Sequence, residues 1–395
     1  MMSWTDEDFF MTPRSCTAEF PLHVLLQTNL LLPYLDLLDG TALRAVCREL
    51  RDAVTDYVWT DRVPVRAIER WRACFPRATS LFYIGRSKVF FPQRLRILVV
   101  FGSKLFSRAF RRLKALTHVT LRSCHGVTAV LPLLSRLKTL DLSYCRFHGD
   151  ALRELTAVES LVVQGCKGVT NADLAPLTTL RRLDISETYR IDTALLELPN
   201  LRHLCVNSAP DSVSVLCWLA LDSLCACNIP ADIDWALPRG LKRVVLMNSP
   251  GPDARLRALH GCESVDLSGT DYDVFTPLEG VAELKLHRAS LCGLRDLRGP
   301  LPVLDISYTR PHPSSTFGHL THIGLLRAHG CSWLDAAGFE YVGHVDELEM
   351  TCVHQAAFVM RDFCRRLGVR VVHTCDCSAY KFKYPDGPIV RVERC

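Results

Sequence analysis

Long hydrophobic runs are missing from this sequence of 395 residues. Its longest nearly apolar stretch runs from Leu30 to Leu35, far short of the roughly 18 apolar residues that a membrane-spanning helix needs. The first residues carry Asp6, Glu7 and Asp8, whereas secretory and transit segments are basic or poor in acids. We therefore expect no membrane span, and we expect the protein in the cytoplasm, the nucleus or both.

Signatures of catalysis and cofactor binding are also missing. The sequence holds no G-x-x-x-x-G-K-S/T loop, no G-x-G-x-x-G after a predicted strand, no H-E-x-x-H and no G-x-S-x-G. We therefore expect no cofactor and no enzyme activity. The 18 cysteines are about 5% of the chain, too sparse for a disulfide scaffold, and we expect mostly reduced thiols.

Acidic residues are almost absent from one segment of the chain. Between Arg62 and Lys114 there are 14 Lys or Arg and a single acid, Glu69, a net charge of +13. The rest of the chain then holds 33 basic and 41 acidic residues, a net charge of −8. Such a distribution predicts one basic surface that an RNA or an acidic protein could meet. The predicted patch comprises Arg86, Lys88, Arg94, Arg108, Arg111, Arg112 and Lys114.

A repeat of about 21 residues organises most of the sequence. Thirteen nine-residue segments carry apolar residues at their first, fourth and sixth places, and their starts lie 19 to 25 residues apart. We take a further segment, from Leu367, as the last of the series. The thirteen begin at Leu95, Leu116, Leu137, Val158, Leu180, Leu201, Leu221, Leu241, Cys262, Val281, Leu301, Leu320 and Val345.

This spacing predicts an α/β solenoid. The fourth and sixth places lie two residues apart and share the buried face of a strand, which leaves the third, fifth and seventh places to solvent. The dozen or so residues between strands allow only a short helix or 3₁₀ turn, so that neighbouring strands run parallel. The pattern resembles the leucine-rich repeat over residues 95–375 and predicts a curved parallel sheet of about 13 short strands.

The ninth place of the repeat is often cysteine or threonine, as at Cys124, Cys145 and Thr188. In leucine-rich repeats this place is commonly Asn, Cys or Thr, turned inward to bond the loop backbone. A column of cysteines could also suggest a metal or redox site, but small buried thiols are the favoured interpretation.

The solvent-facing places form the predicted partner-binding surface, on the concave face, where a target protein would bind. Asp at the fifth place with Ser at the seventh recurs four times and would make an acidic row able to hold a basic segment. A metal or disulfide site at His203, Cys205, Cys225 and Cys227, or at His373, Cys375 and Cys377, is a weaker alternative, and we assign no metal ligand. The predicted surface residues are Arg122, Asp141, Asp184, His203, Asp266, Lys285, His287, Asp305 and Glu349.

A small helical module precedes the repeats. An apolar stripe at Leu43, Val46, Cys47, Leu50 and Val54 has helical spacing, and Pro33 ends or bends the stretch before it. With Phe20-Pro21, Tyr34-Leu35-Asp36, the Val-Cys-Arg core from Val46 and Val58-Trp59, residues 20–63 resemble an F-box, although Leu50 stands where that family usually has Trp. The resemblance implies adaptor contacts through Pro21, Leu22, Leu25, Leu35, Leu43, Val46, Cys47, Leu50 and Trp59.

Two functional hypotheses follow. An F-box ahead of leucine-rich repeats implies a non-catalytic substrate receptor that docks on the adaptor and cullin of a ubiquitin ligase, while the repeats bind a target protein. The alternative is a scaffold or assembly factor of a ribonucleoprotein or another large complex, which would use the basic segment 62–114. We divide the chain into a flexible 1–19, a helical module 20–63, a basic connector and cap 64–94, repeats 95–366, and a last repeat with its cap or tail 367–395.

Overall fold

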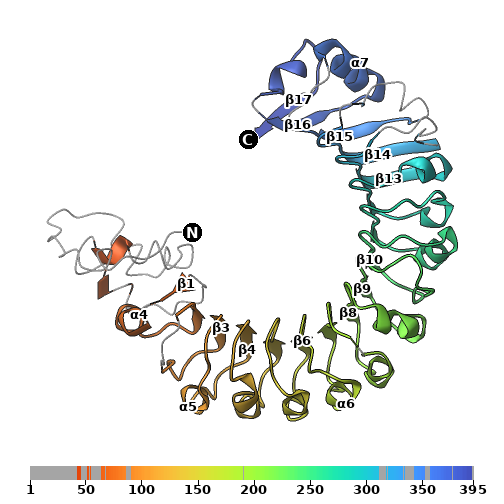
Figure 1. The fold of residues 1–395 in the computed structure, drawn as a ribbon. Helices are drawn as coiled ribbons and strands as arrows, with labels where there is room; N and C mark the ends of the chain where they lie inside the picture. Colours follow the sequence, from red (N-terminus) through yellow and green to blue (C-terminus); the bar gives the residue numbers. More distant parts are fainter. Residues whose placement is uncertain are drawn as a thin grey trace, which may run out of the picture. The chain divides into compact units, whose positions relative to one another are not determined.

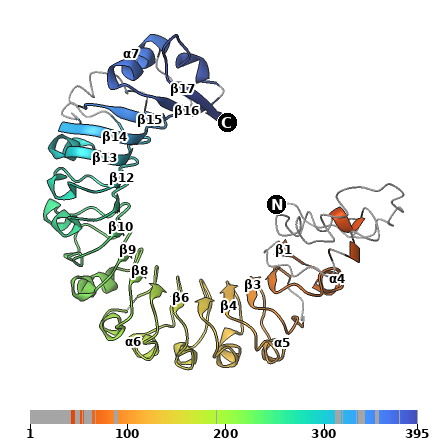
Figure 2. The ribbon, with the colours of Figure 1, turned by 180° about the vertical axis from the view of Figure 1, so that it is seen from behind.

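A computed structural model describes residues 42–45, 51–52, 54, 64–66, 68–85, 90–189, 191–310, 317, 319–331, 333, 342–351, 356–375 and 377–393. The chain divides into two compact units, residues 1–184 with 197–200, and residues 185–196 with 201–395. In each unit the strands lie side by side along one flank of the coils, with short helices and turns along the opposite flank (Figures 1 and 2). Within the described residues, no helix has the length and apolar character to cross a membrane.

The first unit holds seven parallel strands in its described residues, each paired with the next in chain order. Between them lie short helices, of which α4 is the longest with seven residues. The strands are β1 (Pro64–Val65), β2 (Ser80–Tyr83), β3 (Ile97–Phe101), β4 (His118–Arg122), β5 (Thr139–Asp141), β6 (Ser160–Val162) and β7 (Arg182–Asp184). The helices are α4 (Ile68–Cys74), α5 (Ser107–Phe110), η3 (Val127–Ala129), η4 (Leu131–Leu133), η5 (Gly149–Leu152) and α6 (Asn171–Leu174).

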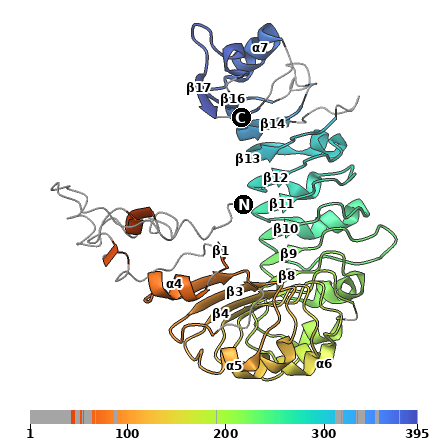
Figure 3. The same cartoon turned by 60° about the vertical axis from the view of Figure 1, so that its left-hand side comes forward.

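Ten parallel strands are described in the second unit, again paired in chain order, and Figure 3 shows β8 to β14 stacked one upon the next. The strands are β8 (His203–Cys205), β9 (Ser223–Cys225), β10 (Arg243–Val245), β11 (Ser264–Asp266), β12 (Glu283–Lys285), β13 (Arg298–Asp305), β14 (His319–Arg327), β15 (Val345–Glu349), β16 (Val371–Cys375) and β17 (Ile389–Glu393). The remaining helices are η6 (Thr193–Glu197), η7 (Pro210–Trp218), η8 (Asp253–Leu259), η9 (Thr276–Leu278), η10 (Cys292–Asp296), α7 (Ala357–Leu367) and η12 (Ala379–Lys381).

The repeat pattern explains where the core lies. Leu140 and Leu142, at the fourth and sixth places of one coil, are fully buried, as are Leu284 and Leu286 in the second unit. A single coil has one apolar row that it cannot cover, so the coils above and below must cover it. The predicted leucine-rich-repeat solenoid is confirmed within each unit by this burial and by the parallel pairing.

Side chains at the ninth place link successive coils. The thiol of Cys145 donates to the carbonyl oxygen of Leu121 at 2.6 Å, and the thiol of Cys166 to that of Leu142 at 3.1 Å. The acceptor is in both cases the sixth-place carbonyl of the preceding coil. Burial raises the pKa of Cys145 to about 12, which keeps it a neutral donor. In the second unit, Ser249 and Cys331 donate in the same way to Ala226 and Ile306.

The eighth place adopts a left-handed backbone in twelve successive coils, with φ between 51° and 70°. This conformation ends the strand and turns the chain toward the opposite flank. Glycine would be the expected residue, yet the chain uses several others. The residues are Gly102, Ser123, Tyr144, Gly165, Glu187, Ser208, Asn228, Asn248, Gly269, Arg288, Tyr308 and Gly330.

Large residues at the eighth place depend on the coil that follows. A Cβ atom on Gly165 would lie 2.6 Å from Cδ1 of Tyr144, and one on Gly330 would lie 2.6 Å from Cδ1 of Tyr308. Each tyrosine ring therefore lies against the backbone of the next coil, where only glycine leaves room for it.

Two predicted repeat boundaries were wrong. Leu304, at the fourth place of its repeat, pairs with Leu326 and not with Ile323. Leu326 therefore takes the fourth place of the next repeat, which begins at Ile323, three residues after the predicted Leu320. Its own sequence, IGLLRAHGC, ends in the buried Cys331 at the ninth place. Apolar residues at both Leu320 and Ile323 fit the pattern, and the wrong one was taken as the start.

The repeat predicted to begin at Leu367 also begins at a different residue. Leu367 is the last residue of α7, which Gly368 ends in a left-handed conformation. Val372, and not Arg370, occupies the fourth place because it pairs with Leu348. The repeat therefore begins at Val369, and its ninth place is Cys377.

Parallel strands also occur outside the thirteen predicted segments. β1 and β2 lie in the segment 64–94 that was expected to be a connector and cap, and β17 follows the last predicted repeat. Leu81 of β2 pairs with Leu98 and is fully buried, so it takes the fourth place of one more coil. The described residues thus hold more strands than the roughly thirteen expected.

We predict that replacing Gly165 with Ala destabilises the protein more than replacing Gly102 with Ala. Both glycines take the eighth place with left-handed φ, but a Cβ atom on Gly102 would have no neighbour within 4 Å. Backbone strain alone should cost Gly102→Ala about 1–2 kcal/mol, and the clash with Tyr144 should add about 1–3 kcal/mol for Gly165→Ala. Denaturant unfolding measures both, and adding Tyr144→Ala should recover the difference. Equal costs for the two glycines would contradict the ring contact.

Candidate functional site: the exposed strand face

The third and fifth places of the strands form the exposed face of each unit. In the second unit the fifth places of six adjacent strands pair directly, one with the next. The first five carry charges that alternate in sign along the row, and the sixth is a histidine. We call this row the charge ladder: Asp266, Lys285, Asp305, Arg327, Glu349 and His373.

Ion pairs connect the ladder to its neighbours. Arg327 donates from Nε to Oε2 of Glu349 at 2.8 Å. Nζ of Lys285 lies 3.1 Å from Oε1 of Glu283. Nε2 of His329 lies 3.3 Å from Oε1 of Glu349. Partial burial alone would raise the pKa of Glu349, but the hydrogen bond and the charge of Arg327 outweigh it and hold that pKa below its usual range. The face is therefore a network of paired charges.

The predicted acidic row takes a different form in the structure. Asp141 is only 7% exposed, because its Oδ2 accepts from Nε of Arg122 at 2.7 Å while its Oδ1 accepts from the backbone of Ser143. In the second unit, Asp266 and Asp305 each accept from the backbone N–H two residues later, at 3.0 and 2.9 Å. The recurring Asp-x-Ser thus closes the turn after the strand, and basic residues separate its acids.

The seventh place is buried in the four coils that carry Asp-x-Ser, whereas Arg122 and Met247 at the same place in other coils are exposed. Ser143, Ser186, Ser268 and Ser307 are all buried. Most strands in this part of the solenoid end at the fifth place, so the seventh already belongs to the turn. Ser143 is fully buried, and its hydroxyl donates to Asp141 at 2.6 Å.

Of the residues His203, Cys205, Cys225 and Cys227, the three cysteines contact Asn207. Nδ2 of Asn207 donates to the sulfur of Cys205 at 3.2 Å, and its Oδ1 accepts from the Cys225 thiol at 3.2 Å and from the backbone of Cys227 at 2.8 Å. The sulfurs of Cys225 and Cys227 lie 3.6 Å apart. No group of three possible metal ligands exists among the described residues, including the tail, where His373 contacts Glu347 at 3.1 Å.

An aromatic pair lies at the border of the face in the second unit. His287 stacks on Tyr308 with 5.0 Å between ring centroids, and the guanidinium of Arg288 lies 5.9 Å from the centroid of the same ring. Tyr308 is nevertheless 51% exposed. A depression of about 750 Å³ beside it is lined by Pro250, Gly269, Thr270, Asp271, Arg288, Ala289, Ser290, Tyr308 and Arg310.

The residues of the basic segment 62–114 divide between the buried core and the exposed surface of the first unit. Phe91, Phe110 and Tyr83 are buried and contact one another edge to face, as capping residues would. Arg94, Arg108, Arg111, Arg112 and Lys114 are exposed, whereas Arg86 and Lys88 lie outside the described residues.

Two cations lie over the rings of Phe90, which is exposed, and Phe106, which is half-buried. The guanidinium of Arg108 is 5.7 Å from the ring centroid of Phe90 and 6.0 Å from that of Phe106, and Nζ of Lys104 is 6.0 Å from the latter. Phe90 is 56% exposed. We call these four residues the cation–aromatic patch.

The F-box-like contacts fall mostly outside the described residues. Of the predicted adaptor-binding residues only Leu43 is described, half-buried in helical residues 42–45. Its neighbour Arg44 donates to the carbonyl of Cys74, the last residue of α4, at 3.0 Å and lies over the ring of Phe75. Val54 is fully buried. The described part of this segment therefore packs on the first helix of the solenoid.

Sequence reasoning missed Arg327, a residue of the ladder, and His329, which contacts Glu349 beside it. When the repeat is taken to begin at Leu320, Gly324 and Leu326 are assigned to the fifth and seventh places. In the structure Arg327 and His329 occupy these places. Cys331 was the available signal, since it places a cysteine at the ninth position only when the unit begins at Ile323.

The chain matches no known protein-family profile and no curated protein sequence. Among solved structures it is similar to TLR13 in a complex with ssRNA13, with a TM-score of 0.48 and 17% identity over 79% of this chain and 59% of that chain. It is also similar to the internalin InlF of Listeria monocytogenes, with a TM-score of 0.38 and 14% identity over 82% of this chain and 84% of that one. The chain thus spans less than two thirds of the TLR13 chain. The solenoid assignment rests on this chain's own repeat and strand pairing.

We predict that the paired charges make the protein less stable in acid. Because the folded-state pKa of Glu349 lies below its ordinary value of 4.5, its contribution is fully present above that pH and is lost as the pH falls through the lowered value. A Glu349→Gln variant should therefore lose less unfolding free energy between neutral and acidic pH than the parent. Urea unfolding at several pH values tests this, with Glu263→Gln as a control at an exposed glutamate. Identical acid sensitivity in the parent and Glu349→Gln would contradict the role of the pair.

Proposed function

We propose that this chain is a non-catalytic protein-binding receptor, and that its particular role is to recognise substrates for a cullin-RING ubiquitin ligase in the cytoplasm or nucleus. In this proposal the segment 20–63 docks on the adaptor and the exposed strand face binds the target. The observation that carries it is the attachment of the F-box-like segment to the repeats, where Arg44 bonds the end of α4. A rigid attachment is what a receptor needs to present its target at a fixed place.

The surface around Tyr308 is the best-suited part of the strand face for holding a target. Tyrosine is enriched among residues that dominate binding energies, because it offers a large rigid surface with a polar end. Tyr308 is held by His287 on one side and by the backbone of Gly330 beneath, so little side-chain entropy remains to be lost. The charges of the ladder already have partners, either in the ladder or beside it, which leaves shape and apolar contact to select the target.

The proposal predicts that adaptor and cullin are captured through the N-terminal segment. Full-length chain should retain both from a lysate, and a Pro21→Ala, Leu25→Asp variant should lose them while keeping proteins bound to the repeats. Leu196→Asp is the matched control, because Leu196 is an exposed leucine outside the segment. Mass spectrometry of the captured proteins gives the result. Absence of adaptor and cullin from the parent, or their equal retention by the Leu25 variant, would overturn the ligase role.

The cation–aromatic patch favours a second candidate function, the binding of single-stranded nucleic acid within a larger assembly. Cations neutralise phosphates, and exposed rings stack on bases. In the patch, Lys104 and Arg108 stand beside Phe90 and Phe106 at cation–π distances. No described ion pair engages either cation.

This second candidate predicts salt-dependent binding of a single-stranded RNA oligonucleotide. Arg108→Gln should weaken binding and lower the slope of log affinity against log salt by about 1, and Phe90→Ala should weaken it at every salt concentration. Arg243→Gln, an exposed arginine of the second unit, is the control. Fluorescence anisotropy over a salt series measures all four proteins. Absent or salt-insensitive binding would remove this candidate.

A further inference from the structure

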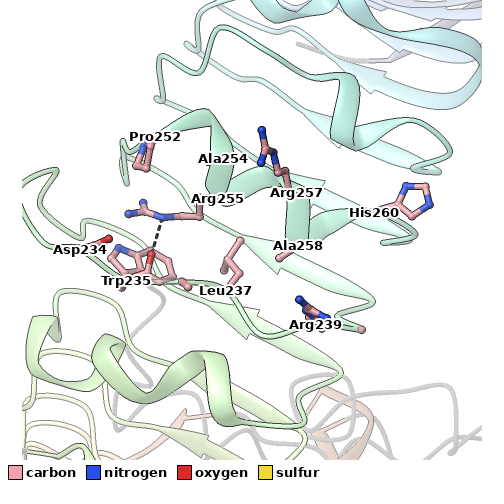
Figure 4. A pocket seen from close by; sticks show the side chains of 12 residues that line it. Asp234, Trp235, Leu237, Arg239, Pro252, Ala254, Arg255, Arg257, Ala258 and His260 are labelled. Atoms are coloured by element: carbon pink, nitrogen blue, oxygen red, sulfur yellow. Dashed lines mark hydrogen bonds between the residues drawn. The ribbon is translucent and has the colours of Figure 1, made fainter.

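A hollow on the helix-bearing flank of the second unit has a simple structural origin. The coil between β9 and β10 has no helix, although the neighbouring coils carry η7 and η8. The side of η8 is consequently left uncovered, and a pocket of about 580 Å³ remains there (Figure 4). That volume is in the range of small-ligand sites. We call it the arginine pocket; it is lined by Asp234, Trp235, Ala236, Leu237, Arg239, Gly240, Pro252, Ala254, Arg255, Arg257, Ala258 and His260.

Arg255 is the unusual residue of this pocket, because it is only 5% exposed. Its guanidinium lies 4.2 Å from the ring centroid of Trp235, and its hydrogen bonds reach two carbonyl oxygens, those of Trp235 at 3.4 Å and Pro250 at 3.2 Å (Figure 4). Within the described residues, its Nη2 has no hydrogen-bond partner, and neither has Nε1 of Trp235. No described carboxylate pairs with it. Besides the two carbonyls and the ring, the structure records only the hydroxyl of Tyr272 as interacting with this guanidinium among the described residues. A buried cation with neutral partners is costly unless an anion approaches it.

The rest of the lining has the same charge. Arg239 and Arg257 are exposed at the pocket, as is His260, and none of them forms an ion pair within the described residues. Asp234 is the only acidic residue of the lining. Three arginines and one aspartate give a formal charge of +2, counting His260 as neutral. A phosphate monoester carries about −1.5 to −2 charges near neutral pH and matches it, whereas a single carboxylate does not.

Apolar groups complete the lining and define what the anion must carry. Leu237 and Ala258 lie between Arg239 and the other two arginines in Figure 4, and Pro252 lines the pocket beside Arg255. A bare ion would leave this surface exposed to water, whereas a ring attached to the phosphate would cover it. Guanidinium groups bind phosphate oxygens through paired hydrogen bonds, so that either exposed arginine of the lining, Arg239 or Arg257, can hold the group while Arg255 supplies buried positive charge.

We propose that the arginine pocket binds a phosphate monoester attached to an apolar or aromatic body. The site is independent of the adaptor segment and of the strand face, and therefore does not rest on the function proposed above. The phosphate can be carried by a modified side chain of a partner protein or by a small metabolite such as a nucleotide. Both sources present the same chemistry to the pocket.

Phenyl phosphate is the probe that tests the proposal on the full chain. Calorimetry should give saturable binding that is tighter than for inorganic phosphate, and phenol should not bind. The tryptophans can be labelled with fluorine, and the ¹⁹F signal assigned by Trp235→Phe should shift on titration. A phosphotyrosyl peptide and adenosine monophosphate, compared at equal ionic strength, show which source the pocket prefers, and preference for either supports the site.

Exposed arginines supply variants that should fold normally. Arg239→Gln with Arg257→Gln should weaken phenyl phosphate at least about tenfold, the effect of losing one charged hydrogen bond. Arg243→Gln, on a strand beside the pocket coil, should leave affinity unchanged. Arg255→Gln should also abolish the Trp235 shift, but the conclusion does not depend on it, since that variant removes a buried group. Failure of the parent to bind phenyl phosphate would overturn the proposal. Equal affinity of the double variant and the parent would also overturn it, because the anion would then be attracted by the general charge of the surface and not by this pocket.

Discussion

The stacking of coils in each unit depends on satisfying the buried sixth-place carbonyls, to which a ninth-place cysteine or serine donates from the next coil and a ninth-place threonine from the same coil. The thiols of Cys145 and Cys166 make the bond between coils in the first unit, and Ser249 and Cys331 make it in the second. The sixth-place carbonyl lies just beyond the strand, where the ladder of strand hydrogen bonds is ending. A side-chain donor there satisfies a buried acceptor, and a donor from the next coil also keeps two coils at a fixed spacing. The apolar rows of neighbouring coils can then meet along their whole length.

Much of the solenoid could be predicted from the sequence, because its period is carried by buried leucines that have no other place to go. Leu140, Leu183 and Leu284 take the fourth place as expected. One error arose where two apolar residues, Leu320 and Ile323, both fitted the first place of the repeat. Another arose where a helix supplied the leucine, as at Leu367. Pattern alone cannot separate these cases; the cysteine at the ninth place would have decided the first.

The candidate surfaces were less predictable, because exposure depends on how neighbouring coils combine. The acids at the fifth place were found correctly, but their partners come from the adjacent coils and from their own turns. Asp141 is the clearest example, since Arg122 of the preceding strand covers it. The arginine pocket left no motif in the sequence at all. It arises because one coil lacks a helix, and its essential residue, Arg255, is an arginine in a place that composition would assign to the surface.

The left-handed eighth place has a consequence for how this chain can change over time. Tyr144 and Tyr308 lie against glycines one coil later, and the side chain of Asn248 lies in the same way against Gly269. A bulky residue at one eighth place and a glycine at the next therefore form a matched pair, separated by 21 or 22 positions in sequence. The glycine cannot be exchanged alone without strain, whereas the pair can be gained or lost together with its two coils. Duplication of two coils would copy an exposed aromatic together with its support, and so multiply a binding surface in one step.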